Sequence, residues 1–430
     1  MKDTLIMPSN SLLTIDMVTR EAVRIFKNSN LFVMNMDTQY DGQFARDGAK
    51  IGDVLRIRLP NDYIVNDGPA LQIQTTSEQY TSLALTSYKT VGLAFTTAER
   101  TLSIDDYDEI VLAPAVNALA GKVATTVMLA SEGGVCNFVS NVDNSAALNA
   151  VSATGKIISP TSEQFLQANA VLDDNSADQM TRRMVNDPTT DARTTVSLQG
   201  LLNPTPEISA QFRTGMMKSG LGYEKWFRDQ TVIKHTSGTF SAGGTVNGGN
   251  QTTSPSGGTV LVNAITGTLK KGDFVTFAGV NAVNPVTKQS LGTLRQFVVT
   301  ADVATNGTLI PVFPGLIPSA TFVAGGPDQQ YQTVDASPIN GAAMILASQS
   351  GEVYRKSIAY VQKAITMASA DLVIPRKAVE EAARATYDGI SLRILTDYLP
   401  NSDQLATRLD VIFGQAYLRP QWCCAVADKV

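Results

Sequence analysis

The sequence predicts an α+β fold that carries an all-β insertion. Residues Ser103–Gly133 place apolar side chains at helical spacing, whereas residues 388–430 alternate apolar and polar side chains as strands do. Between them, residues 236–330 contain few charges and are rich in Val, Thr and Gly. These three patterns indicate a body of helices and sheets interrupted by a separate β module, the name used below for residues 236–330.

The composition describes an acidic chain with enough apolar residues for a large core. At 430 residues it is long enough for roughly two to four domains. The 34 basic and 39 acidic residues give a net charge of −5, which argues against a nucleic-acid binder because phosphate contacts need clustered Lys and Arg. If the protein lies beside DNA, we expect only weak, non-specific proximity.

The cysteines and the N-terminal segment bear on the compartment. Cys136, Cys423 and Cys424 are an odd set with a vicinal pair, which is a poor disulfide framework and favours a reducing compartment. The first 30 residues show no signal-peptide pattern, and no 18 apolar residues run together. We therefore expect a soluble protein made in a cytoplasm, without a membrane partner.

The N-terminal part divides into an arm and an extended loop. Within residues 1–40, apolar side chains recur at helical spacing from Ile15 to Phe26, which predicts one helix. Residues 41–95 are polar and punctuated by glycines, and the segment Leu55–Leu59 alternates leucine and isoleucine with two arginines. This pattern predicts a long hairpin with little core of its own, which needs a neighbour to cover it.

Further helices are expected between the loop and the module. The helix predicted over Ser103–Gly133 has Ser103 as a possible cap, acidic residues in its first turn, and Pro114 as a kink or as the start of its main part. Shorter helices are expected at Ser162–Leu172, Val196–Leu202 and Pro206–Phe212.

The β module and the C-terminal part supply most of the expected strands. In the module, Phe274–Ala278 and Arg295–Thr300 are short β-type runs joined by a turn-rich connector. After the module we expect a buried strand at Ala342–Ala347 and a short helix at Arg376–Ala385. Two alternating runs, from Ile390 and from Leu405, then predict adjacent antiparallel strands joined by the turn 399–402.

Motifs for catalysis, metals and cofactors are weak throughout. His235 is the only histidine, and we expect it to be an ordinary surface residue rather than a catalytic base. One histidine and three cysteines do not give zinc spacing, the acidic turn at Asp173–Asp178 lacks the rest of a calcium loop, and the glycine motifs match neither a phosphate loop nor a dinucleotide fold. We predict a non-enzymatic protein with no cofactor. A hydrolase that works through His235 is the least favoured of the three hypotheses weighed for this chain.

Three segments carry a resemblance to a known family. The run FAGVNAVNPVTKQSLGTLRQFVVTADV lies at Phe277–Val303, DGISLRILTDYLPNSDQLATRLDVIFGQAYLRPQWCCAVA at Asp388–Ala427, and PAVNALAGKVATTVM at Pro114–Met128. Together they resemble the major capsid (coat) proteins of tailed bacteriophages, in particular the P22 type with an inserted β-barrel domain. The resemblance implies the Hong Kong 97 capsid fold.

The resemblance also implies a division of the chain and a function. The implied parts are an N-terminal arm (1–40), an extended loop (41–95), a peripheral domain with the spine helix (96–141), an axial domain in two pieces (142–235 and 331–387), the inserted β-barrel (236–330) and closing strands (388–430). Copies would assemble as hexamers and pentamers, with scaffolding and portal proteins, into an icosahedral precursor shell (procapsid). That shell would form in the host cytoplasm and expand on DNA packaging to give the capsid of the virion.

Contacts between copies are the remaining expectation. Lys50, Arg56 and Arg58 on the extended loop are candidates to pair with an acidic cluster of a neighbour. That cluster consists of Asp105, Asp106 and Asp108. The alternative from another class is a phage surface or decoration protein whose β module binds a glycan or receptor, which predicts a separable 236–330 fragment.

Overall fold

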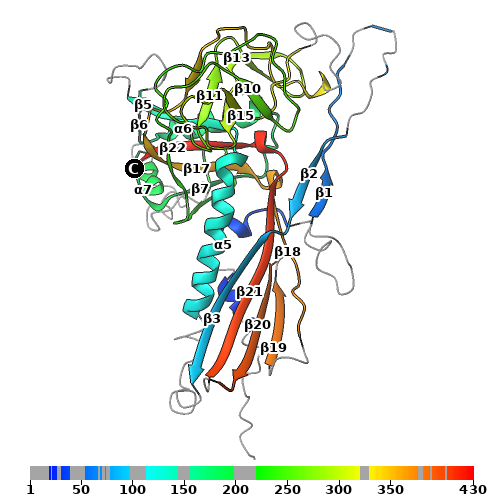
Figure 1. Ribbon diagram of the computed structural model, residues 1–430, viewed down its shortest axis with the longest axis vertical. Helices are drawn as coiled ribbons and strands as arrows, with labels where there is room; N and C mark the ends of the chain where they lie inside the picture. Colours follow the sequence, from blue (N-terminus) through cyan, green and yellow to red (C-terminus); the bar gives the residue numbers. More distant parts are fainter. Residues whose placement is uncertain are drawn as a thin grey trace, which may run out of the picture.

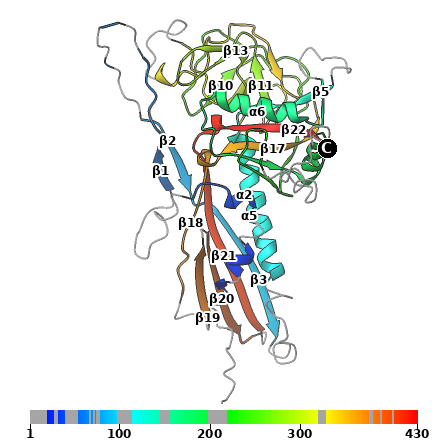
Figure 2. The same ribbon diagram turned by 180° about the vertical axis from the view of Figure 1, so that it is seen from behind.

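The protein is elongated, with a sheet at its centre, the β module on one side and a long sheet on the other (Figure 1). The computed structural model describes residues 19–20, 22–26, 31–38, 54–65, 68–69, 73, 78–96, 113–143, 155–197, 219–319, 329–375, 381–387, 390–401 and 404–430. Of the expected N-terminal helix, residues 22–26 are helical, and Ala22, Val23 and Phe26 are buried. A further short helix, α2 (Leu31–Met34), lies beside the long helix α5 (Figure 2).

The helix α5 (Ala113–Gly134) runs along the long axis and confirms the described part of the predicted long helix (Figure 1). Its apolar face is continuous, and nine of its residues are buried, from Ala115 to Ser131. The helix ends where a side chain does not fit, because a Cβ on Gly134 would lie 2.5 Å from the ring of Tyr417. By length and composition α5 is apolar enough to span a membrane, but 44% of that stretch is buried inside the fold, where it packs as a core helix.

The central sheet has the strand order β4-β22-β17-β7-β8, with β9 also paired to β17. Its strands are β4 (Asn137–Val139), β22 (Cys423–Lys429), β17 (Val353–Val361), β7 (Arg182–Asn186), β8 (Lys225–Arg228) and β9 (Lys234–Thr236). The middle strand β17 is buried along almost its whole length, as expected for a strand covered on both faces. The helix α6 (Ser162–Asp174) packs against β22 and β4 and confirms the helix predicted there.

Smaller elements surround this sheet. The strands β5 (Asn141–Asp143) and β6 (Lys156–Ile158) form a two-stranded sheet, and the helix α7 (Pro188–Ser197) follows β7. The helix expected at Val196–Leu202 meets the structure only at its first two residues, which end α7; the rest of it and Pro206–Phe212 lie outside the described residues.

The long sheet has the order β18-β21-β20-β19, and β3 also pairs with β21. Its strands are β18 (Ile365–Ser369), β21 (Gln404–Tyr417), β20 (Ile390–Leu399), β19 (Glu381–Tyr387) and β3 (Ser87–Thr96). The antiparallel pair β20–β21 confirms the strands predicted from alternation. The helix predicted at Arg376–Ala385 is wrong: its described residues belong to β19, because edge pairing with β20 overrides the helical preference of an Ala- and Glu-rich run.

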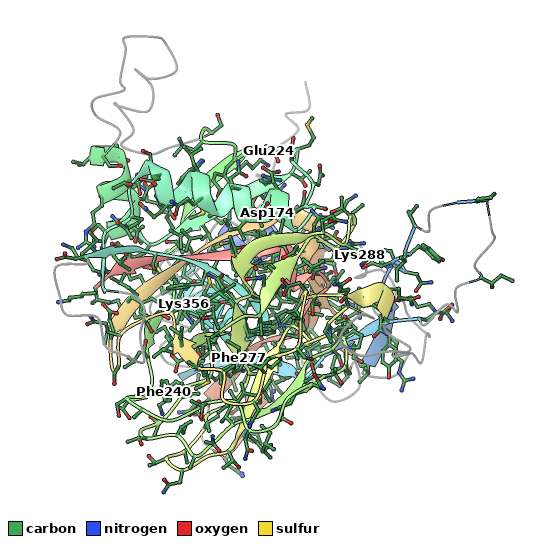
Figure 3. The ribbon with its side chains drawn as sticks, turned by 90° about the horizontal axis from the view of Figure 1, so that it is seen from above. Asp174, Glu224, Phe240, Phe277, Lys288 and Lys356 are labelled. Atoms are coloured by element: carbon green, nitrogen blue, oxygen red, sulfur yellow. The ribbon has the colours of Figure 1, made fainter. Side chains whose placement is uncertain are left out.

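The β module is built on the sheet β10-β15-β14-β11-β16 and the hairpin β12–β13. These strands are β10 (Gly258–Leu261), β11 (Phe274–Phe277), β12 (Asn281–Val283), β13 (Ser290–Leu294), β14 (Phe297–Val299), β15 (Leu309–Phe313) and β16 (Met344–Leu346). The predicted runs become β11 and β14, which pair antiparallel over a separate core that includes Phe240 and Phe277 (Figure 3). The strand predicted at Ala342–Ala347 is β16, and it completes this sheet from beyond residue 330.

Three short 3-10 helices complete the described elements. They are η3 (Gln329–Tyr331), η4 (Gln362–Ala364) and η5 (Pro420–Trp422). The segment η4 joins β17 of the central sheet to β18 of the long sheet, and η5 joins β21 of the long sheet to β22 of the central sheet. Each of these two segments therefore carries the chain from one sheet to the other.

Candidate functional site

The hairpin β1–β2 has little core of its own. The strands β1 (Val54–Arg58) and β2 (Tyr80–Ala84) pair antiparallel, as the alternation predicted. Their inner side chains, Ile57 and Leu83, are buried against Ala368, Ala416 and Leu418 of the long sheet and its end. The hairpin is therefore held by the sheet beneath it, and its other face is open.

The fit between hairpin and sheet depends on a glycine. A Cβ on Gly414 of β21 would lie 2.1 Å from the carbonyl oxygen of Ala84 at the end of β2. Backbone meets backbone here, so no rotamer change could make room for a side chain. Gly414 thus lets β2 cross β21 closely.

Of the predicted contact residues, only Arg56 and Arg58 lie within the described residues. Arg56 and Arg58 are exposed, the guanidinium of Arg56 lies 5.2 Å from the centre of the Tyr80 ring, and Arg58 Nε lies 3.5 Å from Oε2 of Glu78. Both arginines have contacts within their own hairpin. Lys50, Asp105, Asp106 and Asp108 lie outside the described residues, so their pairing stays a prediction.

The segment that joins β1 to β2, residues 59–79, is called the excursion below. Its described residues include large, exposed apolar side chains. Tyr63 is 58% exposed, and Val65 and Ile73 are each 89% exposed. Two contacts tie the root of the excursion to the β module and the residue that follows it: Lys288 Nζ lies 3.7 Å from Asp62 Oδ2, and the Tyr331 hydroxyl donates to Asn61 Oδ1 at 3.1 Å. The excursion is thus anchored at its root, and Val65 and Ile73 further along it are exposed.

A buried carboxylate holds the middle of the long sheet. Asp410 on β21 is fully buried, and its two oxygens accept hydrogen bonds from Arg408 Nε at 2.6 Å and Arg393 Nη2 at 2.5 Å. Burial alone would raise the pKa of Asp410, but hydrogen bonds from Arg393, Arg408, Thr90 and Tyr88 lower it below its ordinary value. The pair with Arg393 connects β20 to β21, whereas Arg408 lies on β21 itself.

A second buried cluster joins the β module to the body. His235 on β9 lies between two carboxylates: Nε2 is 2.9 Å from Oδ1 of Asp273, and Nδ1 is 3.4 Å from Oε1 of Glu132 on α5. Lys356 on β17 donates from Nζ to the Gly272 carbonyl at 2.5 Å and lies near the middle of the molecule in the view along its long axis (Figure 3). We call these four residues the junction cluster.

The junction cluster changes how its members titrate. Burial lowers the pKa of Lys356 to about 8, although Asp273 and Glu132 act to raise it. Burial acts to raise the pKa of Glu132, but its hydrogen bond to His235 and the charges of Lys356, His235 and Lys271 lower it overall. The histidine expected at the surface is in fact 3% exposed, because three distant segments close over it.

The junction cluster is not arranged for catalysis. Both ring nitrogens of His235 face carboxylates, so neither is placed to take a proton from a nucleophile. The thiols of Cys136, Cys423 and Cys424 are buried and burial raises their pKa, which makes them inert. Within the described ranges, no group of three or more His, Cys, Asp or Glu could hold a metal ion.

An open hairpin face, an excursion with exposed apolar side chains and an inserted module are features expected of a structural protein that packs against other chains. A family model described as "P22 coat protein - gene protein 5" matches residues 49–425. The chain belongs to the P22 coat protein family. It is a phage capsid protein with the α+β fold of the Hong Kong 97 type, a component of the virion that assembles into a shell of copies of itself.

Several solved structures are similar to this chain at low sequence identity. A chain of Mycobacterium phage Che8 is 10% identical, with 92% of this chain and 90% of that chain covered and a TM-score of 0.42. A capsid chain of cyanophage P-SCSP1u is 9% identical, with coverages of 91% and 88% and a TM-score of 0.43. The CUS-3 coat protein I-domain is 28% identical over 24% of this chain and 94% of its own, with a TM-score of 0.19. No curated protein matches the sequence.

The sequence pointed to the hairpin but not to the two buried clusters. Alternation at residues 55–59 was a sufficient signal for β1. The partners of His235 lie 38 and 103 residues away, and Asp410 meets Arg393 across 17 residues of a hairpin. Strand register places Arg393 opposite Asp410, and tertiary packing brings Glu132 and Asp273 to His235. A single sequence gives no direct signal of either.

Proposed function

We propose that this coat protein forms hexamers and pentamers of a tailed-phage precursor shell, assembled in the host cytoplasm with a scaffolding and a portal protein, which expands as DNA enters. The observation that carries the proposal is the excursion after β1. Val65 and Ile73 are each 89% exposed on a segment whose described residues show no core of their own. Exposed apolar groups on a long excursion are stabilised when another chain covers them.

The charge of the chain fits a container for DNA. A net charge of −5 opposes tight binding to phosphates, so the packaged DNA would slide past the inner wall rather than be held on it. Contact with the packaged DNA would then be weak, non-specific proximity.

The test is assembly of a variant that changes only the excursion. Val65→Asp and Ile73→Asp together put charges where the proposal places a neighbour's apolar surface. Because both side chains are exposed, the unassembled double variant should unfold at the same temperature as the wild type. With a scaffolding protein, the wild type should give closed shells by sedimentation and negative-stain microscopy, and the variant should not.

Two results would contradict the proposal. Shells of normal size and yield from the double variant would show that the excursion is not covered by a neighbour. A wild-type chain that stays monomeric with the scaffolding protein present would remove the scaffold-assisted pathway. Matching Val65→Thr and Ile73→Thr replacements, which keep a branched Cβ and add no charge, serve as the control and should assemble.

A further inference from the structure

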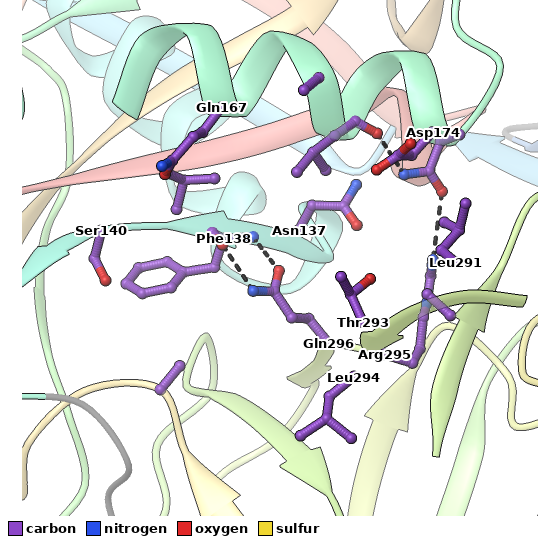
Figure 4. A pocket seen from close by; sticks show the side chains of 16 residues that line it. Asn137, Phe138, Ser140, Gln167, Asp174, Leu291, Thr293, Leu294, Arg295 and Gln296 are labelled. Atoms are coloured by element: carbon purple, nitrogen blue, oxygen red, sulfur yellow. Dashed lines mark hydrogen bonds between the residues drawn. The ribbon is translucent and has the colours of Figure 1, made fainter. Parts of the chain in front are cut away.

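A pocket lies between the body and the β module, and its lining includes neither the hairpin β1–β2 nor the junction cluster. It has a volume of about 480 Å³ and is bounded by α6, β4 and the hairpin β12–β13 with the residues that follow it (Figure 4). Phe138 and Val171 line it from the body, and Leu291 and Leu294 from the module. The volume lies in the range of small-molecule pockets.

Arg295 is the unusual residue in this pocket. It is only 5% exposed and lines the cavity, where Nη1 donates to Asn175 Oδ1 at 3.3 Å and Nε has no hydrogen-bond partner (Figure 4). Among the described residues no carboxylate forms an ion pair with it. A guanidinium remains charged in proteins, so this is a buried cation without an anion. Such a charge is costly unless something pairs with it.

The other polar groups nearby do not supply the missing anion. Gln296 is uncharged and bonds the backbone of Phe138: its Oε1 accepts from the Phe138 amide at 2.6 Å, and its Nε2 donates to the Phe138 carbonyl at 2.8 Å (Figure 4). Asp174 lies at the exposed rim, where burial and then the charge of Asp173 raise its pKa. A carboxylate at the rim disfavours a doubly charged ligand such as phosphate.

We infer that this pocket binds a monocarboxylate with a short apolar chain. The carboxylate would pair with the guanidinium of Arg295, which offers two parallel donors of the right geometry. The chain would lie against Phe138, Leu291 and Leu294, which are apolar. Because the walls come from both the body and the β module, the bound ligand would stabilise the attachment of the module. The inference does not depend on shell assembly.

The experiment uses the full, unassembled chain with hexanoate as the probe. Calorimetric titration should show one site, and thermal unfolding should shift upward with hexanoate concentration. Inorganic phosphate tests the preference for a single charge, and hexan-1-ol tests the need for the carboxylate. Both should bind at least about tenfold more weakly than hexanoate.

Variants at an exposed position keep the test independent of folding. Thr293 lines the pocket two residues before Arg295 and is exposed, so its replacement should not disturb the fold. Thr293→Glu adds a negative charge near the site and should weaken hexanoate binding roughly tenfold, whereas the matched Thr293→Gln should leave it unchanged. Arg295→Gln should abolish binding.

The proposal has clear ways to fail. Absence of hexanoate binding, or binding that is the same in Thr293→Glu and Thr293→Gln, would overturn it. Equal binding of hexan-1-ol would reduce the pocket to an apolar cavity and also overturn it. An acidic peptide that binds in an Arg295-dependent way while hexanoate does not would assign the site to a polypeptide partner instead.

Discussion

Replacing Lys356 by Met should change how the stability of the chain responds to pH. The ammonium group is buried in the junction cluster, 5.0 Å from the centre of the Phe274 ring and 2.5 Å from the Gly272 carbonyl oxygen. Burial lowers the pKa of Lys356 from 10.5 to about 8. In the unfolded chain the same group keeps its ordinary pKa, so the two states bind protons differently.

This difference in proton binding makes the free energy of unfolding depend on pH. Between about pH 8 and pH 10.5 the unfolded chain holds the proton more tightly than the folded one, so the free energy of unfolding rises with pH. The whole effect corresponds to about 3 kcal/mol, and about 1 kcal/mol of it falls between pH 7 and pH 9. Lys356→Met has no titrating group and should lose this rise.

The assay is urea unfolding of the unassembled chain at pH 7 and pH 9, followed by tryptophan fluorescence. Trp226 belongs to the main core and Trp422 packs against it, so both report on the body. Buried thiols and tyrosines with raised pKa act in the opposite direction at the alkaline end, but they are present in both chains and cancel in the difference.

A surface lysine provides the control. Lys363→Met removes an exposed ammonium and should leave the pH dependence of unfolding as in the wild type. If wild type and Lys356→Met show the same change in unfolding free energy between the two pH values, the ammonium is not desolvated in the folded chain. The account of the junction cluster would then be wrong.

Three further predictions concern the hairpin and the long sheet. Gly414→Ala should destabilise the unassembled chain by about 1–3 kcal/mol in urea and expose β2 to proteolysis, whereas Gly92→Ala, whose Cβ would meet nothing within 4 Å, should be near neutral. Asp410→Asn should lower the free energy of unfolding by about 3 kcal/mol at pH 7. Because the pKa of Asp410 is lowered in the folded chain, the difference in unfolding free energy from wild type should shrink as pH falls below about 4. A difference that stays constant with pH would refute this prediction. Reversing the charges of Arg56 and Arg58 together should impair shell assembly seen by microscopy, and normal shells would exclude their role between subunits.

Elements with a strong local pattern were predictable, and elements decided by pairing were not. Alternation of apolar and polar side chains identified β20 and β21, and helical spacing identified α5 and α6. The segment at β19 has the composition of a helix and becomes a strand only because β20 offers it an edge. Local preference is a small free energy, and tertiary pairing exceeds it.

The site was less predictable than the fold for the same reason. The glycine- and serine-rich surroundings of His235 resembled a linker, yet Asp273 and Glu132 bury it from two sides. Arg295 begins a β-type run whose other residues are uncharged, and nothing in the local sequence marks it as a buried cation that lines a pocket. Strand pairing also extends the sheet of the β module beyond residue 330, because β16 at 344–346 pairs with β11. The separable 236–330 fragment of the decoration-protein alternative stays a prediction.

The connections between the sheets bear on the proposed expansion of the shell. The segments η4 and η5 carry the chain between the central and long sheets. The amides of Leu418 and Arg419, just before η5, donate to the carbonyl of Ala364 in η4 at 2.8 and 3.2 Å. The helix α5 packs against strands of both the long sheet and the β module. A body braced in this way should rotate as one unit, because bending would break the bonds at the crossings. Changes of shape during expansion are then left to the hairpin and its excursion, whose core is small and whose outer face is open.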